Sequence, residues 1–71
     1  MYHFISTKRF NELLQQRPII NEHPSLSLID DLRKILGYGI YQAKLLMQRS
    51  NTVQEAINLN HNIVMEMHKS N

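Results

Sequence analysis

Two glycines that flank a tyrosine divide the central part of the chain into two helix-forming segments. Residues 28–47 read LIDDLRKILGYGIYQAKLLM, with apolar residues at helical spacing on both sides of Gly37–Gly39. Glycine allows the backbone to reverse tightly and lets two helices approach closely. Arg33 precedes the glycines and Lys44 follows them. We therefore predict a helix–hinge–helix unit with a basic residue on each arm.

Length and composition restrict the class of protein. The chain has 71 residues, no cysteine and a net charge of +2, so it is expected to form one domain without disulfides or thiolate metal sites. No apolar run approaches a membrane span, and the N-terminus lacks the layout of a signal peptide. We expect a cytoplasmic protein without a membrane segment. The mild basic charge permits contact with nucleic acid or an acidic protein but requires neither.

Residues 1–24 are predicted to form a helix followed by a connector. Ser6 is a candidate N-cap, and Ile5 before it has the spacing to pack on Phe10. The dipeptide Arg17-Pro18 should end this helix, because the residue before a proline is pushed out of the α region. In the connector, Ile19-Ile20 is predicted to pack against the core. The expected apolar stripe of the helix is Phe10, Leu13 and Leu14.

The second predicted helix is the most regular. Ser27 is its expected N-cap, with Asp30 at the third helical position, and Arg33 and Lys34 lie toward its negative end. Gly37 should end it in the left-handed conformation. Its predicted apolar stripe is Leu28, Ile29, Leu32, Ile35 and Leu36.

The third predicted helix begins near Gly39 and ends near Arg49-Ser50. It is apolar on more than one side, and such a helix in a small domain should lie centrally and touch the others. Its apolar residues are Ile40, Tyr41, Ala43, Leu45, Leu46 and Met47.

The fourth predicted helix starts at Thr52, with Glu55 completing a capping box. The segment Asn58–Asn62 is rich in poor helix formers, so we expect the helix to fray or end there. The residues predicted to face inward are Val53, Ala56, Ile57, Val64 and Met67. If the C-terminal segment is helical, its apolar residues exceed what one small core covers and form a candidate dimer seam of Ile63, Val64 and Met67.

These elements together predict an all-α fold, a small bundle of four short helices in a single domain, 1–71. Within it, residues 1–24 hold the N-terminal helix and connector, residues 25–60 a three-helix core, and residues 61–71 a frayed or helical tail.

The central residues resemble two known families. Leu32-Arg33, Gly37-Tyr38-Gly39-Ile40 and Ala43-Lys44 are similar to the N-terminal domain of elongation factor Ts and to the helical hairpin of the C-terminal domain of the bacterial ribosomal stalk protein. In both families an arginine precedes a glycine–x–glycine hinge by four residues, and a lysine follows its second glycine by five. The segment 51–57, NTVQEAI, is similar to the third helix of the elongation-factor domain.

The resemblance covers about residues 26–59 and implies a ubiquitin-associated-like three-helix core. Leu36 stands where the families usually have threonine, one residue is missing before Thr52, and residues 1–25 have no counterpart. The nucleotide-exchange body of elongation factor Ts is also absent, so exchange activity is not carried over. Both families are non-enzymatic and bind translation factors through these helices. The implied partner-binding residues are Arg33, Lys34, Gly37, Tyr38, Gly39, Tyr41 and Lys44.

A small helix-turn-helix DNA-binding regulator is the alternative. Ala43 and Val53 have roughly the spacing of that motif. Met47 stands where the turn needs a small residue, and no Arg or Lys follows Arg49 within the candidate reading helix. The residues that would face DNA are Arg49, Thr52, Gln54, Glu55 and Asn58.

No motif in the chain indicates an enzyme. The four histidines, His3, His23, His61 and His68, are scattered without metal-ligand spacing. Asp30-Asp31 is better explained as the start of a helix than as an acid–base pair. We therefore expect no catalytic residues, no metal and no cofactor, and a protein as the partner. Nucleic acid and a second copy of the chain remain open.

Overall fold

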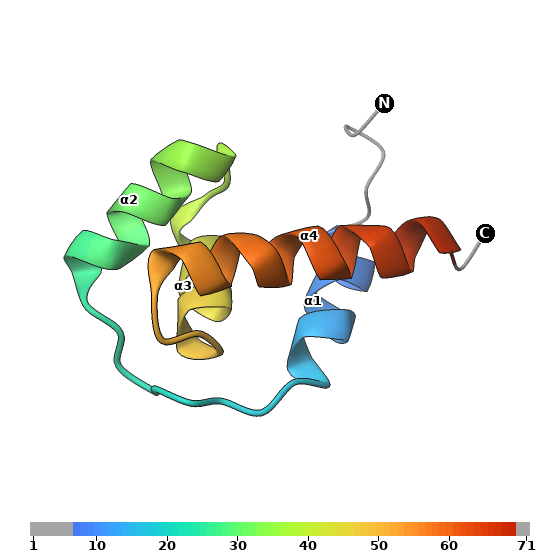
Figure 1. Cartoon of the computed structure of the whole chain (residues 1–71), viewed down its shortest axis with the longest axis horizontal. Helices are drawn as coiled ribbons and strands as arrows, with labels where there is room; N and C mark the ends of the chain where they lie inside the picture. Colours follow the sequence, from blue (N-terminus) through green and yellow to red (C-terminus); the bar gives the residue numbers. More distant parts are fainter. Residues whose placement is uncertain (1–6, 70–71) are drawn as a thin grey trace.

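The computed structural model describes residues 7–69 of the chain, and these residues form four helices and no strand (Figure 1). The helices are α1 (Thr7–Gln15), α2 (Leu26–Leu36), α3 (Ile40–Gln48) and α4 (Val53–Lys69). The predicted all-α bundle of four helices is therefore confirmed. None of these four helices combines the length and the apolar character that crossing a membrane requires. The expected N-cap Ser6 and its neighbour Ile5 lie outside the described residues.

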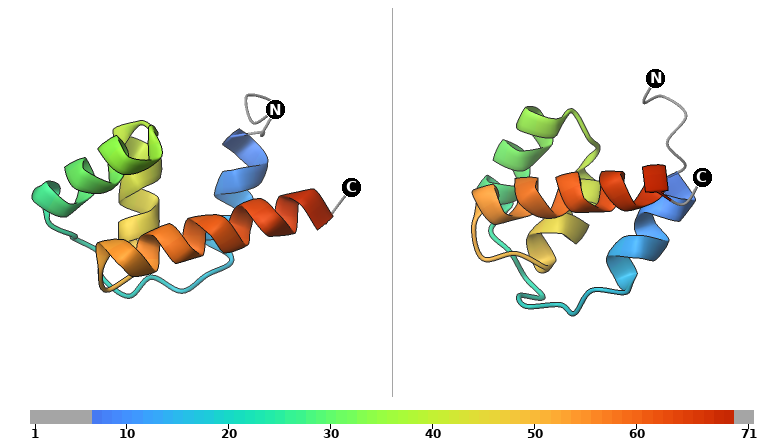
Figure 2. Two further views of the ribbon diagram at one scale, coloured as in Figure 1. Left: turned by 45° about the horizontal axis from the view of Figure 1, so that its top comes forward. Right: turned by 45° about the vertical axis from the view of Figure 1, so that its right-hand side comes forward.

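The helices α3 and α4 hold the bundle together. Each of them contacts all three other helices, whereas α1 and α2 do not contact each other in the described part of the chain. Figure 2 shows α1 and α2 on opposite sides of α3, with α4 running across the other three. The central position predicted for α3 is confirmed. The buried core consists of Phe10, Leu13, Leu14, Ile29, Leu32, Ala43, Leu45, Leu46, Met47, Ala56 and Ile63.

The connector between α1 and α2 corrects one prediction. Ile19 and Ile20, which were expected to pack against the core, are 48% and 56% exposed. The reason lies in the backbone, because the N–H groups of Ile20 and Asn21 both donate to the C=O of Gln48, at 2.8 and 3.0 Å. The connector is thus bonded to the C-terminal end of α3 through its main chain. Pro24 is buried, whereas neither isoleucine is.

The start of α2 corrects a second prediction. The N-cap is Ser25 rather than Ser27, and the Ser25 hydroxyl oxygen accepts a hydrogen bond from the Ser27 N–H at 3.2 Å. Ser25 directly follows the buried Pro24 and keeps an extended ψ of 135°, so the helix begins at Leu26. Asp30 therefore lies beyond the first turn, where its carboxylate bonds other side chains of α2.

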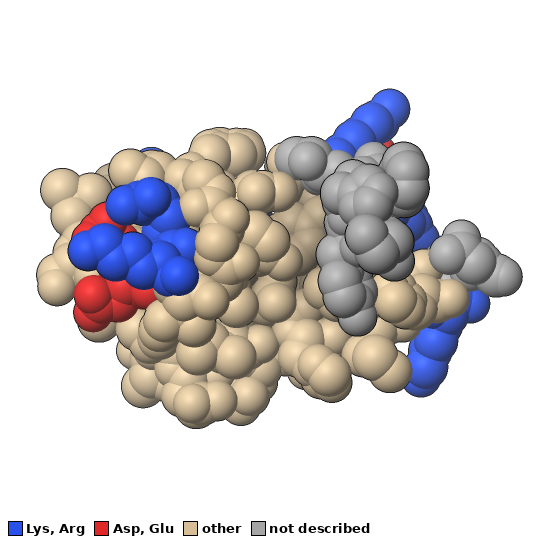
Figure 3. Space-filling view, turned by 90° about the horizontal axis from the view of Figure 1, so that it is seen from above, with Lys and Arg blue, Asp and Glu red and all other residues tan. Residues whose placement is uncertain are grey.

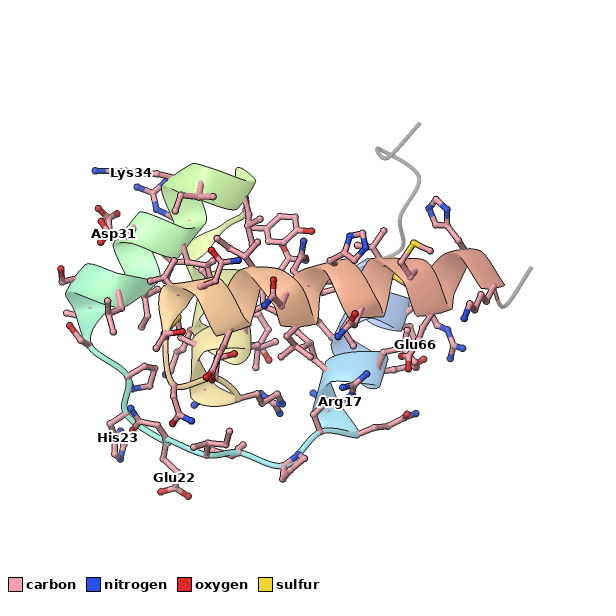
Figure 4. The ribbon with its side chains drawn as sticks, in the orientation of Figure 1. Arg17, Glu22, His23, Asp31, Lys34 and Glu66 are labelled. Carbon is pink, nitrogen blue, oxygen red and sulfur yellow. The ribbon has the colours of Figure 1, made fainter. Side chains whose placement is uncertain are left out.

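The fourth helix continues through Asn58–Asn62 to its end, so the expected break in that segment is wrong. Tertiary contacts outweigh the weak helix propensity. Ile63 is fully buried, and Arg17, which follows α1, forms an ion pair with Glu66 at 3.2 Å (Figure 4). Ile63 therefore belongs to the core of a single chain and is not available for a dimer seam.

The N-terminus of α4 has the predicted capping residues, but one of the two hydrogen bonds of the capping box involves a different residue. The Thr52 hydroxyl oxygen accepts from the Glu55 N–H at 3.1 Å, as a capping box requires. The Glu55 carboxylate, however, accepts from the N–H of Asn51 at 2.9 Å rather than from that of Thr52.

Candidate partner-binding site

The hinge Gly37–Gly39 has the conformation predicted for it. Gly37 ends α2 with φ of 75°, and its N–H donates to the C=O of Arg33 at 2.8 Å. Gly39 precedes α3 with φ of −75° and makes no side-chain cap. Both glycines are exposed, and a Cβ added at either would meet nothing within 4 Å. The two glycines of the corner between α2 and α3 (Figure 1) are therefore open to solvent.

Tyr38, between the two glycines, is turned toward the core. Its ring meets the ring of Phe10 edge-on at 5.6 Å between centroids, and its hydroxyl donates to Asn60 Oδ1 at 2.7 Å. Burial raises the pKa of the Tyr38 hydroxyl, and the hydrogen bond to Asn60 opposes part of that shift. Of the predicted binding residues, Tyr38 thus has a structural role, because it ties the hinge to α1 and α4.

The basic residues of the predicted site differ in their pairing. Arg33 and Lys34 share the carboxylate of Asp30, at 2.9 and 3.0 Å. The hydrogen bond from Arg33, followed by that from Lys34, lowers the pKa of Asp30. Figure 3 shows basic and acidic side chains side by side at the end of the molecule where α2 lies, and the middle of the same face carries no charged side chain. Lys44 on α3 is exposed and forms no ion pair with any residue between 7 and 69.

Three apolar side chains at this corner are open to solvent. Ile35 near the end of α2, and Ile40 and Tyr41 at the start of α3, are 59%, 58% and 59% exposed. We call these three residues, together with Lys34 and Lys44, the corner surface. Tyr41 was predicted to bind a partner. Ile35 and Ile40 were instead predicted as helix stripe residues, because the periodicity shows an apolar residue but not whether a neighbouring element covers it.

The residues of the helix-turn-helix alternative are held mostly by local bonds. The Arg49 guanidinium donates to the C=O groups of Arg17 and Leu45, at 3.2 and 2.9 Å, and desolvation lowers its pKa. Gln54 donates to Asn58 at 3.1 Å on the exposed side of α4. Thr52 and Glu55 form the cap described above.

The described residues form no candidate metal centre. Within residues 7–69 no three His, Cys, Asp or Glu side chains lie close enough to hold a metal ion. His23 and Glu22 of the connector point away from the helices (Figure 4).

Comparison with protein-family models, with curated proteins and with solved structures finds no significant match for this chain. The interpretation of the site therefore depends on its geometry and on the residues quoted above.

Proposed function

We propose that this chain is a non-catalytic protein–protein interaction module that binds its partner through the corner surface. The observation that supports the proposal is the exposure of Ile35, Ile40 and Tyr41 within seven residues of sequence. Single exposed apolar residues are common, but a group of them on a small domain is typical of an interaction site. Aromatic side chains such as Tyr41 are also enriched among the residues that dominate binding energy.

The hinge supports the same proposal by its rigidity. Tyr38 is held by Phe10 and Asn60, so the two helix ends keep a fixed relation to α1 and α4. A surface that is already ordered loses little conformational entropy when it binds. The corner surface is therefore suited to contact a partner without rearranging.

The resemblance to elongation factor Ts and the ribosomal stalk protein makes a component of the translation apparatus the first candidate partner. Arg33 on α2 and Lys44 on α3, which are among the residues that carry the resemblance, lie on either side of the hinge in the sequence. Another component of a nucleic-acid-handling machine is the broader candidate.

DNA binding through α4 has less support. Residues 50–68 contain no Lys or Arg, and phosphate neutralisation by such cations supplies most of the affinity of DNA-binding proteins. The guanidinium of Arg49, which would contact a phosphate, already donates to two backbone carbonyls.

The test is affinity capture from the cells that make the protein, together with titration of purified bacterial elongation factors. The variant Ile35→Ser plus Tyr41→Ser should lose the captured partner, while Met65→Ser, an exposed apolar residue of α4, should retain it. The same thermal melt for all three proteins would show that folding is intact. Equal capture by both variants would contradict the proposal. Retention on duplex DNA that falls steeply with salt would favour the helix-turn-helix alternative instead.

A second variant probes the two basic residues that carry the resemblance. Arg33→Ala plus Lys44→Ala should weaken partner binding and leave the thermal melt unchanged. If the melt collapses, the two residues are structural, and the contact that the resemblance implies for them is wrong.

A further inference from the structure

The outward side of α3 continues past the corner surface toward the other end of the helix. Ile40, Lys44 and Gln48 recur every four residues, which places them in one row along α3. At about 1.5 Å per residue, this row is roughly 12 Å long. Ile40 and Lys44 are exposed and Gln48 is partly exposed. Tyr41 precedes Lys44 by three residues and Gln48 by seven, which places it on the same side of the helix.

The connector lies at the far end of this row. The side-chain amide of Gln48 donates to the C=O of Glu22 at 3.1 Å, and the C=O of Gln48 accepts from the N–H of Ile20 at 2.8 Å. These two bonds place the exposed Ile20 next to the end of the row. We call Ile40, Tyr41, Lys44, Gln48 and Ile20 the α3 ridge. Exposed apolar residues lie at both ends of it, and a cation lies between them.

We propose that the α3 ridge is a docking face for an acidic amphipathic helix of a partner protein. The inference rests on the proposed function and extends it, because it names the chemistry of the partner and carries the contact from the corner to the connector.

Charge complementarity determines the acidic character of the partner. Residues 32–54 contain no carboxylate. Of their cations, Arg33 and Lys34 share Asp30 and Arg49 donates to backbone carbonyls, whereas the exposed Lys44 at the centre of the ridge has no ion pair among the described residues. Glu22 is exposed beside Ile20, so the carboxylates of the partner are expected at its centre, opposite Lys44, and not at its connector end. A partner carboxylate at that position is attracted by Lys44 and is not repelled by Glu22.

The shape of the ridge indicates a helix as the occupant. Rows of side chains spaced four residues apart pack into the grooves of a neighbouring helix, and apolar anchors at i, i+3, i+4 and i+7 on a partner helix match a face of this length. The described residues contain no strand whose edge an extended segment could join. A nucleic acid is disfavoured, because exposed aliphatic groups such as those of Ile20 and Ile40 neither stack on bases nor bind phosphates.

The test uses three synthetic helical peptides of about 18 residues, long enough to form a helix in water. All three carry Leu at the anchor positions, and the remaining positions are Glu, Gln or Lys. Each is titrated into the ¹⁵N-labelled full chain, and amide chemical shifts and peptide fluorescence anisotropy are recorded. We expect the Glu peptide to bind tightest and to shift the amides of Ile20 and of residues 40–48. Equal binding of the Lys peptide, or no shift along the ridge, would overturn the inference.

Single variants separate the ridge from the corner. Ile40→Ser should weaken binding of the Glu peptide by about tenfold, as expected for a buried anchor, and Ile20→Ser should weaken it severalfold. Lys44→Gln should weaken it by about two- to fivefold, the range for one exposed ion pair. Ile35→Ser and Met65→Ser should bind the peptide like the wild type, and the thermal melts should agree for all five variants.

The pattern of outcomes distinguishes the two proposals. If Ile35→Ser and Tyr41→Ser abolish capture of the natural partner while Ile20→Ser has no effect on it, the corner function stands and the ridge is wrong. If a single-stranded oligonucleotide displaces the Glu peptide at the same residues and binds more tightly, the ridge is a nucleic-acid surface and the inference fails.

Discussion

The two ends of α3 differ in how their free backbone groups are satisfied. At the C-terminal end, Arg49 donates to the C=O of Leu45 and Ser50 donates to the C=O of Leu46, both at 2.9 Å. The C=O of Gln48 accepts two N–H groups from the connector. At the N-terminal end, Gly39 provides no side-chain cap and the first two helical residues are exposed.

This contrast separates residues that stabilise the domain from residues that are available for contact. The last carbonyls of a helix must find partners outside the helix, and here two segments supply them, residues 49–50 and the connector. The N-terminal end is positioned instead by the inward-facing Tyr38, so its outer side is left for a partner. Substitutions at the two ends should therefore change different properties of the protein.

The largest change in the free energy of unfolding is expected at the C-terminal end of α3. Arg49→Ala removes the bonds to the C=O groups of Arg17 and Leu45 and should lower the free energy of unfolding by about 2 kcal/mol. Urea denaturation followed by circular dichroism measures the change. The control is Lys44→Ala on the same helix, which should change it by less than about 0.5 kcal/mol. Equal losses of unfolding free energy in the two variants would contradict the special role of the C-terminal end of α3.

The next largest change is expected at Gly37, in the turn that precedes the N-terminal end of α3. Gly37→Ser should lower the free energy of unfolding by about 1–2 kcal/mol, because an L-residue at φ of 75° is strained. A Cβ at this position meets nothing within 4 Å, so the loss comes from backbone conformation and not from a clash. Gly37→Asn, which tolerates the left-handed region better, should lose less. If serine and asparagine cost the same, this explanation of the hinge is wrong.

Tyr38→Phe tests the tie between the hinge and α4. Loss of the hydroxyl bond to Asn60 should lower the free energy of unfolding by about 1 kcal/mol at neutral pH. Burial raises the folded pKa above the ordinary value of 10.0, so the folded state holds the phenol proton more tightly than the unfolded state. The stability from this group is present below pH 10 and is lost as the pH rises through the folded pKa.

The pH dependence provides the control for that variant. The difference in unfolding free energy between the wild type and Tyr38→Phe should shrink above pH 10, and denaturation curves at several alkaline pH values measure it. A difference that stays constant through this range would show that Tyr38 is not protected by burial.

Local patterns account for much of the fold. The left-handed Gly37, the end of α1 before Pro18 and the buried stripe of α1 depend on residues close in sequence, and all three predictions are confirmed. The connector could not be predicted in this way. Whether Ile20 is covered depends on a bond to Gln48, far along the chain. The continuation of α4 through Asn58–Asn62 likewise depends on the burial of Ile63 against other helices.

The candidate site shows the same division. The positions of Arg33 and Lys44 on either side of the hinge follow from the spacing of the sequence. The inward direction of Tyr38 does not, because its partners Phe10 and Asn60 belong to α1 and α4. Periodicity also cannot show that Ile35 lacks a covering element. The exposed apolar residues of the corner surface therefore required the arrangement of all four helices.

The smallest effect is expected at Gly39 and has the opposite sign. Gly39→Ser places a hydroxyl at the N-cap of α3, where its oxygen can accept from the first free N–H groups, and should raise the free energy of unfolding by a few tenths of a kcal/mol. The backbone there is extended, with φ of −75°, and a Cβ meets nothing within 4 Å, so serine fits without strain. The same substitution at the two glycines of one hinge should thus stabilise at position 39 and destabilise at position 37. Thermal melts of both variants measure the two signs. Because Gly39 gives the N-terminal end of α3 no side-chain cap, a loss of stability at both positions would mean that the first N–H groups of α3 gain nothing from a hydroxyl there.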